Sequence, residues 1–484
     1  MSEIANLKPA AIWRNFHALT QVPRPSGHLE KVQQFLLDWA KEHNVEAFQD
    51  PAGNIVMRKP ATPGYENRKV VLLQAHMDMV PQTAEGVQHD WTKDPILTEK
   101  ITEDGVEWLT AKGTTLGADD GIGVAAAMAA ATSAEHGPLE LFFTVDEETS
   151  MLGATALDIN NIDSNLMINL DSEQEGEVCI GGAGGTAVDC VWKFVQSDVA
   201  EGDVALRITL HGLKGGHSGL DIHLERANAI KAMARVLRTA VKEMEARLVS
   251  FSAGKLRNAV PSKAVAVVTV PDEGVSDMIE FIRMAENELK DVYAGVDDGL
   301  MLDVEAVETP SKQIPEEVQD DIINAICGAP DGVYRHLAGK ADVEASLNHS
   351  YITTESGSVT IGMLLRSARA VTMSEVYETV ESLYTMAGAE VKIIDEYVEW
   401  TPNYDSELMR ITVDSYKSLF GTEPRVYTMH AGLECGIIAA KRDGMDIVSV
   451  GPTLRHPHST GEKLDIASVS RFVKLLGKVL IAIN

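Results

Sequence analysis

Four runs of apolar residues without alternation predict buried strands. The first covers residues 70–80 (VVLLQAHMDMV), and the others cover 139–145, 166–170 and 446–450. Near-continuous Val, Leu and Ile is typical of parallel strands that are covered on both faces, whereas a strand with one exposed face alternates. The pattern therefore predicts a mostly parallel, mixed sheet covered by helices.

Helical spacing of apolar residues predicts the elements around this sheet. Two helices lie within residues 9–44 on either side of a proline-rich break, and a final helix spans about 465–483. A run of small residues (VAAAMAAA) follows the segment 113–123 (GTTLGADDGIG) and predicts a helix that packs closely on the sheet. Strands and helices in this order indicate an α/β domain.

The pattern changes between the third and fourth buried runs. Strands such as 205–211 and 358–366 have one polar face, and amphipathic helices lie between them. One-sided strands indicate an antiparallel sheet with helices on its other face. We therefore expect an inserted α+β domain at 187–396, and a discontinuous α/β domain made of residues 1–186 and 397–484.

Composition limits the class of protein. The 484 residues include 72 acidic and 42 basic ones, and the formal net charge of −30 argues against nucleic acid and anionic membrane surfaces as partners. No apolar run approaches the roughly 20 residues of a membrane span, and from the acidic and polar residues at its start we expect no export signal. The four cysteines are scattered and form no CxxC pair. We expect a cytoplasmic protein with free thiols.

Acidic residues and histidines follow each buried run. The carboxyl ends of parallel strands meet at one edge of a sheet, where open α/β folds bind their ligands. Two further aspartates, Asp119 and Asp120, stand at the start of the small-residue helix. The residues expected to converge on this edge are His76, Asp78, Asp119, Glu147, Glu148, Asp171 and His458.

So many carboxylates in one crevice predict a metal site. Carboxylates a few ångströms apart raise one another's pKa and do not all ionise without a cation. The set calls for about two divalent ions. Histidine and carboxylate ligands without thiolates suit a catalytic Zn²⁺ site, and Co²⁺ or Mn²⁺ would also fit. Helix capping explains one of the two adjacent aspartates, Asp119 and Asp120, better than it explains both.

Eight short motifs extend this picture. HMD, GADDGIG, DEE, DSEQEGE, LKGGHSG, LRNAVP, HAGLECG and PHS occur in this order. Together they resemble the dizinc aminopeptidase and aminoacylase clan of metallopeptidases, and within it the aminoacyl-histidine dipeptidases (peptidase D, also called Xaa-His or cytosolic non-specific dipeptidases). The resemblance covers nearly the whole chain. It implies the dizinc-peptidase fold with its inserted lid domain, and a homodimer formed through that domain.

The resemblance also implies a role for each predicted ligand. Asp119 matches the carboxylate that bridges both metals. His76 and Asp171 match the residues that complete one metal site, and Glu148 and His458 match those that complete the other.

Two catalytic roles follow in the same way. Glu147 resembles the general base, and Asp78 resembles the residue that orients a ligand imidazole and fixes its tautomer. The residues alone leave two alternatives open. Glu147 and Glu148 could exchange roles, and His456 could be the ligand in place of His458.

Three residues of the expected lid domain resemble groups that bind substrate. His217 in GGHSG matches a histidine that stabilises the oxyanion, and Asn258 in LRNAVP and Arg366 in LLRS match groups that bind the free carboxylate of the substrate. Each also has a purely structural explanation: a histidine in a glycine-rich loop, an asparagine in a turn, and an arginine at a strand end.

Three further positions stay without a role. Asp120 departs from peptidase D sequences, which have asparagine there. His430 and Glu434, both in HAGLECG, either line the substrate pocket or support a glycine-rich loop.

The implied activity is that of a metal-dependent dipeptidase. Its substrates would be unblocked dipeptides, with Xaa-His and carnosine-like dipeptides among the candidates. Two alternatives remain, an N-acyl-amino-acid amidohydrolase of the same clan and a catalytically silent metal-binding homologue.

Overall fold

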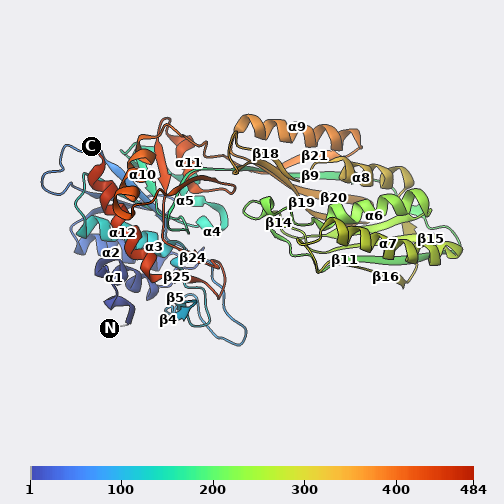
Figure 1. Cartoon of the computed structure of the whole chain (residues 1–484), viewed down its shortest axis with the longest axis horizontal. Helices are drawn as coiled ribbons and strands as arrows, with labels where there is room; N and C mark the ends of the chain where they lie inside the picture. The colour runs from blue at the N-terminus through green and yellow to red at the C-terminus, as the bar shows by residue number, and fades with distance from the viewer. Residues whose placement is uncertain (1–2) are drawn as a thin grey trace. The chain divides into compact units, whose positions relative to one another are not determined.

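A computed structural model describes residues 3–484, which form two compact units (Figure 1). The first unit comprises the chain up to Gly181, together with Trp400–Thr428 and Leu433–Asn484. The second comprises Gly182–Glu399 and the short segment Met429–Gly432. The second unit is thus built mainly from one continuous stretch of chain. In the sequence, this stretch is inserted between two segments of the first unit.

An eight-stranded mixed sheet forms the centre of the first unit, in the order β1-β2-β6-β3-β7-β23-β8-β22. The four strands β6, β3, β7 and β23 are parallel, and the pairs β1–β2, β2–β6 and β23–β8 are antiparallel. Their bounds are β1 Glu46–Gln49, β2 Ile55–Lys59, β3 Val71–His76, β6 Leu139–Thr144, β7 Leu166–Asn169, β8 Glu177–Gly182, β22 Arg425–Met429 and β23 Asp446–Ser449. All residues of β3 and β6 are buried, as near-continuous apolar runs require.

Helices cover this sheet. Buried Trp13, Phe16, Phe143 and Phe472 belong to one hydrophobic core with the sheet residues. A smaller antiparallel sheet has the order β24-β25-β5-β4. The remaining bounds of this unit are η1 Glu3–Asn6, α1 Ala10–Thr20, α2 Glu30–Glu42, β4 Thr98–Glu103, β5 Val106–Ala111, α3 Ala118–Ser133, α4 Glu147–Ser150, α5 Leu152–Ala156, η2 Ile159–Asn161, α10 Glu407–Phe420, α11 Glu434–Lys441, β24 Leu454–Arg455, β25 Lys463–Asp465 and α12 Ile466–Ala482.

The small-residue helix α3 begins irregularly. Asp119 and Asp120 have non-helical backbone angles, and the peptide bond between them is cis. Asp120 Oδ1 accepts the backbone N–H of Gly123 at 3.1 Å. One aspartate therefore caps the helix, which frees the other, Asp119, to point elsewhere.

The second unit contains an antiparallel sheet in the order β16-β11-β15-β13-β19-β20-β9-β21, with β18 paired to β19. Helices α6 to α9 pack against it, and residues of these helices and of the sheet form its core. The bounds are β9 Gly184–Lys193, β10 Ser197–Asp198, β11 Asp203–His211, β12 Gly216–His217, η3 Ile222–Leu224, α6 Ala229–Glu243, β13 Arg247–Ala253, β14 Ala259–Val260, β15 Ala264–Pro271, η4 Asp272–Gly274, α7 Val275–Val292, β16 Met301–Val307, β17 Lys312–Gln313, α8 Glu316–Gly328, β18 Gly332–His336, β19 Val343–Glu355, β20 Ser358–Ser367, α9 Ala370–Met386 and β21 Glu390–Tyr397.

The expected fold class is confirmed: a mixed, centrally parallel α/β unit and a separate antiparallel α+β unit. Within residues 3–484, no helix combines the length and the apolar character that a membrane span requires.

Candidate metal centre

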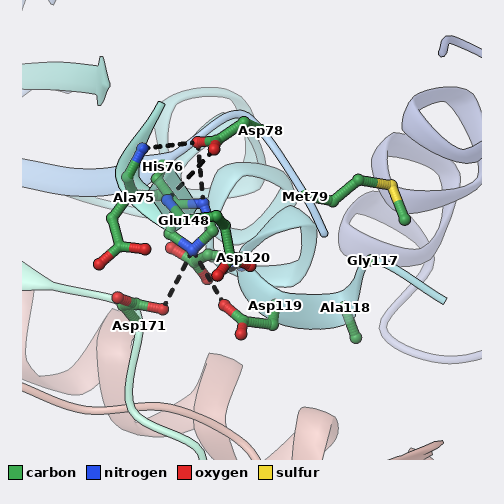
Figure 2. A network of polar contacts seen from close by, with 12 residues as sticks. Ala75, His76, Asp78, Met79, Gly117, Ala118, Asp119, Asp120, Glu148 and Asp171 are labelled. Atoms are coloured by element: carbon green, nitrogen blue, oxygen red, sulfur yellow. Dashed lines mark hydrogen bonds and ion pairs between the residues drawn. The ribbon is translucent and has the colours of Figure 1, made fainter. Parts of the chain in front are cut away.

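The predicted metal ligands all lie in the first unit, where loops follow the parallel strands. His76 is the last residue of β3, Glu148 lies in α4 directly after β6, and Asp171 follows β7. Asp119 comes from the irregular start of α3, and His458 from the loop between β24 and β25. Figure 2 shows the side chains of Asp119 and Asp171 turned toward the His76 ring.

Asp119 lies between two groups of side chains. Its Oδ1 is 2.9 Å from His76 Nε2, which is 3.6 Å from Asp171 Oδ1. Its Oδ2 is 3.0 Å from His458 Nε2, which is 2.9 Å from Glu148 Oε2. One carboxylate thus offers one oxygen to each of two clusters, and each cluster holds one histidine and one further carboxylate.

The chemistry of these clusters fits divalent cations. Ligand atoms of His76, Asp119 and Glu148 all lie within 4.8 Å of one another. Glu148 Oε1 is buried without a hydrogen-bond partner in the described part of the chain, and a buried polar atom without a partner is costly unless something coordinates it. Imidazole nitrogen and carboxylate oxygen are ligands that Zn²⁺, Co²⁺ and Mn²⁺ accept.

Without a bound cation, protons neutralise part of the negative charge of the two histidine–carboxylate clusters. Hydrogen bonds to Asp119 and Glu148 raise the pKa of His458 to about 11. Burial raises the pKa of Asp171 to about 6, with the nearby charge of His76 opposing it. The histidines therefore hold protons that a metal ion has to displace, so metal binding releases protons and strengthens as pH rises.

Asp78 is completely buried and contacts the end of β3, the start of α4 and the loop between α1 and α2. Its Oδ1 is 3.3 Å from Nδ1 of His76, an ion-pair contact between two buried side chains. Its oxygens also accept the backbone N–H groups of Glu147 at 3.1 Å and Glu148 at 3.3 Å, and the Ser26 hydroxyl at 2.8 Å. Asp78 therefore fixes the Glu147–Glu148 turn as well as facing the imidazole.

Glu147 and Glu148 have different surroundings. Glu148 contacts His458, as described above, whereas burial raises the pKa of Glu147 well above its usual value, with further raising by Asp171 and other nearby carboxylates. A raised pKa suits a group that must take and release a proton near neutral pH. The geometry thus brings Glu148 against His458, and it is His458, not His456, that contacts Asp119.

The predicted substrate residues lie in the second unit, where His217, Arg366 and His430 surround Gly219. A Cβ atom at Gly219 would lie 2.1 Å from the His430 carbonyl, 3.1 Å from Arg366 Nε and 3.2 Å from His217 Cε1, so only glycine lets these groups approach. Asn258 lies beside His217, because its carbonyl accepts the backbone N–H of Ser218 at 2.8 Å.

Hydrogen bonds and burial define the protonation of His217 and His430, and Arg366 keeps one N–H for which the described part of the chain offers no acceptor. His217 Nδ1 accepts the backbone N–H groups of Gly219 and Leu220, so the neutral ring carries its proton on Nε2. Arg366 is 3% exposed, and its Nε–H has no hydrogen-bond acceptor in the described part of the chain. Burial, with Arg366 nearby, lowers the pKa of His430 to about 3.

Several buried polar residues of the first unit carry no signal in the sequence pattern. Arg24 and Glu462 are 3% and 2% exposed, and both stand in polar loops where a charged residue normally faces water. Glu434, for which the sequence leaves two roles open, is also buried. It is 3% exposed and accepts hydrogen bonds from Gln74 at 2.7 Å and Thr144 at 2.6 Å, and burial raises its pKa to about 7.

Comparisons with known proteins place the chain among peptidases. The model of peptidase family M20/M25/M40 matches residues 72–482. The chain is 39% identical over 483 residues to a cytosol non-specific dipeptidase of Escherichia coli (strain K12), covering 99% of each protein. It is 40% identical to the crystal structure of aminoacylhistidine dipeptidase from Vibrio alginolyticus, with a TM-score of 0.88 and coverage of 100% of this chain and 98% of that one.

A more distant structure shares the fold alone. The aminopeptidase PepT from Bacillus cereus is 15% identical, with a TM-score of 0.56 and coverage of 99% of each chain.

Proposed function

The chain belongs to peptidase family M20/M25/M40, and on this premise we propose that it is a dinuclear metal-dependent dipeptidase acting on dipeptides with free termini. The observation that carries the proposal is the position of Asp119. A carboxylate that presents one oxygen to each of two histidine–carboxylate clusters has the arrangement that a bridging ligand of two cations needs.

The proposed ligands are His76, Asp119 and Asp171 for one cation, and Asp119, Glu148 and His458 for the other. Zn²⁺ is the proposed metal, because the ligands are nitrogen and carboxylate oxygen without thiolate. The names of the two similar full-length relatives support the substrate class, a dipeptide, and one of them supports a cytosolic location. A homodimer is proposed from the family resemblance.

The side chains of the first unit would carry the proton transfers. Bound cations would lower the pKa of a shared water and polarise the peptide carbonyl. Glu147 would take the proton of the attacking water and pass it to the departing amine. Asp78 would hold the Glu147–Glu148 turn and His76 in the geometry that this transfer requires.

The second unit supplies groups that suit the rest of the substrate. His217 has its Nδ1 occupied by two backbone amides, so Nε2–H is the donor proposed for the oxyanion. Arg366 and Asn258 are proposed to bind the free carboxylate, since a buried guanidinium forms strong charge-assisted hydrogen bonds with an anion.

A dipeptide panel on metal-free protein tests the proposal. Zn²⁺, Co²⁺ and Mn²⁺ are added back separately, and free amino acids are measured for unblocked dipeptides, carnosine, Xaa-His dipeptides and N-acyl amino acids. Hydrolysis of unblocked dipeptides that requires metal is the expected result. Release of acyl groups in its place would favour an amidohydrolase, and no hydrolysis with any metal would favour a silent metal-binding protein.

A further inference from the structure

Glu462 lies beneath the turn that carries Asp119. This carboxylate is 2% exposed and accepts four successive backbone N–H groups. Oε2 accepts those of Leu116 at 2.7 Å and Gly117 at 2.9 Å, and Oε1 accepts those of Ala118 at 2.7 Å and Asp119 at 3.3 Å. Both oxygens of one side chain are therefore used by the main chain of a single turn.

Glu462 is itself fixed in place. Its carbonyl accepts the Thr110 hydroxyl of β5 at 2.7 Å, and its N–H donates to the carbonyl of Ser459 at 3.1 Å. It also follows His458 by four residues, so one short loop provides both a proposed ligand and the residue that holds the turn of another. The loop thereby ties His458 to Asp119 through the backbone as well as through the 3.0 Å side-chain contact.

Arg24 holds the same turn from another side. It is 3% exposed, and its guanidinium donates to the carbonyls of Met77 at 3.1 Å and Asp78 at 2.8 Å, directly after His76, and to the carbonyl of Gly117. Within residues 3–484 it forms no salt bridge with a carboxylate. A buried guanidinium that binds only main-chain carbonyls connects the end of β3 to the Asp119 turn.

Gly117 is the point where these contacts meet. Its φ of +66° favours glycine, and a Cβ atom there would lie 2.6 Å from Arg24 Nη2 and 2.7 Å from Met79 Sδ. The backbone can approach the guanidinium this closely only without a side chain.

The consequence for Asp119 concerns its hydrogen bonds. An aspartate at the start of a helix normally accepts the exposed backbone amides of the first turn. Here Glu462 takes the amides of the turn and Asp120 takes that of Gly123, and in the described part of the chain neither oxygen of Asp119 accepts a backbone N–H. Both oxygens remain for the two clusters.

We propose that Glu462 and Arg24 are positioning residues that hold the 116–119 turn from two sides, so that Asp119 presents one oxygen to each metal position. The proposal rests on the proposed dinuclear function, and it adds that Glu462 and Arg24 set the affinity for metal without touching it. Residues that orient ligands in this way typically account for 10- to 100-fold in metal affinity.

The test compares Glu462→Gln with a matched control, Glu140→Gln. Glu140 is also 2% exposed, and it accepts the backbone N–H groups of Asp163 at 3.0 Å and Ser164 at 2.9 Å at the opposite end of β6. Metal-free protein is titrated with Co²⁺, and the visible absorption bands give the stoichiometry and affinity. The thermal unfolding of the metal-free form reports stability separately.

Glu462→Gln is expected to weaken the binding of at least one Co²⁺ about 10- to 100-fold, because the amide has only one oxygen for four N–H groups. Glu140→Gln should lose comparable thermal stability and keep its Co²⁺ affinity within about twofold. Arg24→Lys should weaken Co²⁺ binding in the same direction, since one ammonium group does not reach the three carbonyls that the guanidinium spans.

Two results would overturn the proposal. One is wild-type Co²⁺ affinity in Glu462→Gln, and the other is an equal loss of affinity in Glu140→Gln, which would make the effect one of general stability. Should Glu462→Gln not fold, Glu462→Asp keeps the charge but withdraws it by one methylene, and the same criteria apply. Failure of the proposed function looks different, because wild-type protein would then bind fewer than two Co²⁺ or hydrolyse no dipeptide.

Discussion

The two units present opposite chemistry at their predicted functional residues. In the first, carboxylates crowd around two histidines that take up protons, as the high pKa of His458 shows. In the second, His430 is held neutral and a buried arginine, Arg366, keeps an N–H without an acceptor in the described part of the chain. In residues 3–484, acidic groups outnumber basic ones in the first arrangement, whereas Arg366 of the second forms no salt bridge with a carboxylate.

This difference teaches how to separate the roles of the residues by experiment. Substitutions in the first unit should change metal content or the chemical step. Substitutions around Gly219 in the second unit should change recognition of the substrate and leave the metals in place. A change of substrate recognition without a change of metal content or chemical step in a first-unit variant, or a loss of metal in a variant around Gly219, would contradict this division.

The largest effect is expected for Glu147→Gln. Loss of the general base should lower kcat by about 10²- to 10⁴-fold, while the protein still binds two metal ions, because Glu147 is not among the proposed ligands. Steady-state kinetics and metal analysis on the same preparation check this. A variant that hydrolyses dipeptides at the wild-type rate would remove Glu147 from the mechanism.

Asp78→Asn should have the next largest effect. The amide replaces one of two oxygens that accept the Glu147 and Glu148 N–H groups, so metal affinity or kcat should fall about 10- to 100-fold. Asp50→Asn is the control, since Asp50 is also buried and accepts the backbone N–H groups of Ala52 and Asn54. Equal losses in both variants would leave Asp78 with a structural role only.

Arg366→Lys should raise KM and leave metal content unchanged. A charge-assisted hydrogen bond contributes about 1.5–3 kcal/mol, so KM for a dipeptide should rise roughly tenfold or more. The difference should disappear for a dipeptide amide, which has no free carboxylate. Arg257→Lys is the control, because Arg257 already pairs with Asp189 at 2.8 Å. A fall in metal content in Arg366→Lys would contradict the division.

The smallest effect concerns stability and pH. The pKa of His430 is about 3 in the folded protein and about 6.5 when unfolded, so the unfolded state binds more protons between these values. Wild-type stability should therefore fall relative to His430→Asn as pH decreases through this window, by about 1 kcal/mol between pH 7 and 5.5. Urea unfolding at both pH values measures it, and parallel stability changes would show that His430 titrates normally.

The strand ends of the first unit could be predicted because a parallel sheet obeys a general rule. His76, Asp171 and the glutamates after β6 stand directly behind apolar runs, and the sheet brings those ends to one edge. His458 was harder, since it follows its strand by several residues, and its motif rather than its position identified it. Distances among these residues depend on loops that no periodicity describes.

The supporting residues were not predictable by the same reasoning. Glu462 in STGEK and Arg24 between two prolines look like ordinary surface charges, and only the tertiary structure shows the main-chain groups that bury them. The sequence predicted that capping explains only one of Asp119 and Asp120, but not which one: the structure shows Asp120 accepting the Gly123 N–H. In the antiparallel unit no rule collects strand ends, so the approach of His217 and Arg366 to Gly219 could not be inferred from spacing.

The segment Met429–Gly432 has a consequence for synthesis on the ribosome. It belongs to the second unit, where the Met429 carbonyl accepts the N–H of Ala183 at 3.0 Å and His430 Nε2 lies 2.7 Å from the Ser346 hydroxyl. The rest of that unit ends at Glu399, about thirty residues earlier. Domains generally fold as they emerge from the ribosome. The second unit, however, emerges without the segment Met429–Gly432, which is synthesised only after Trp400–Thr428 of the first unit.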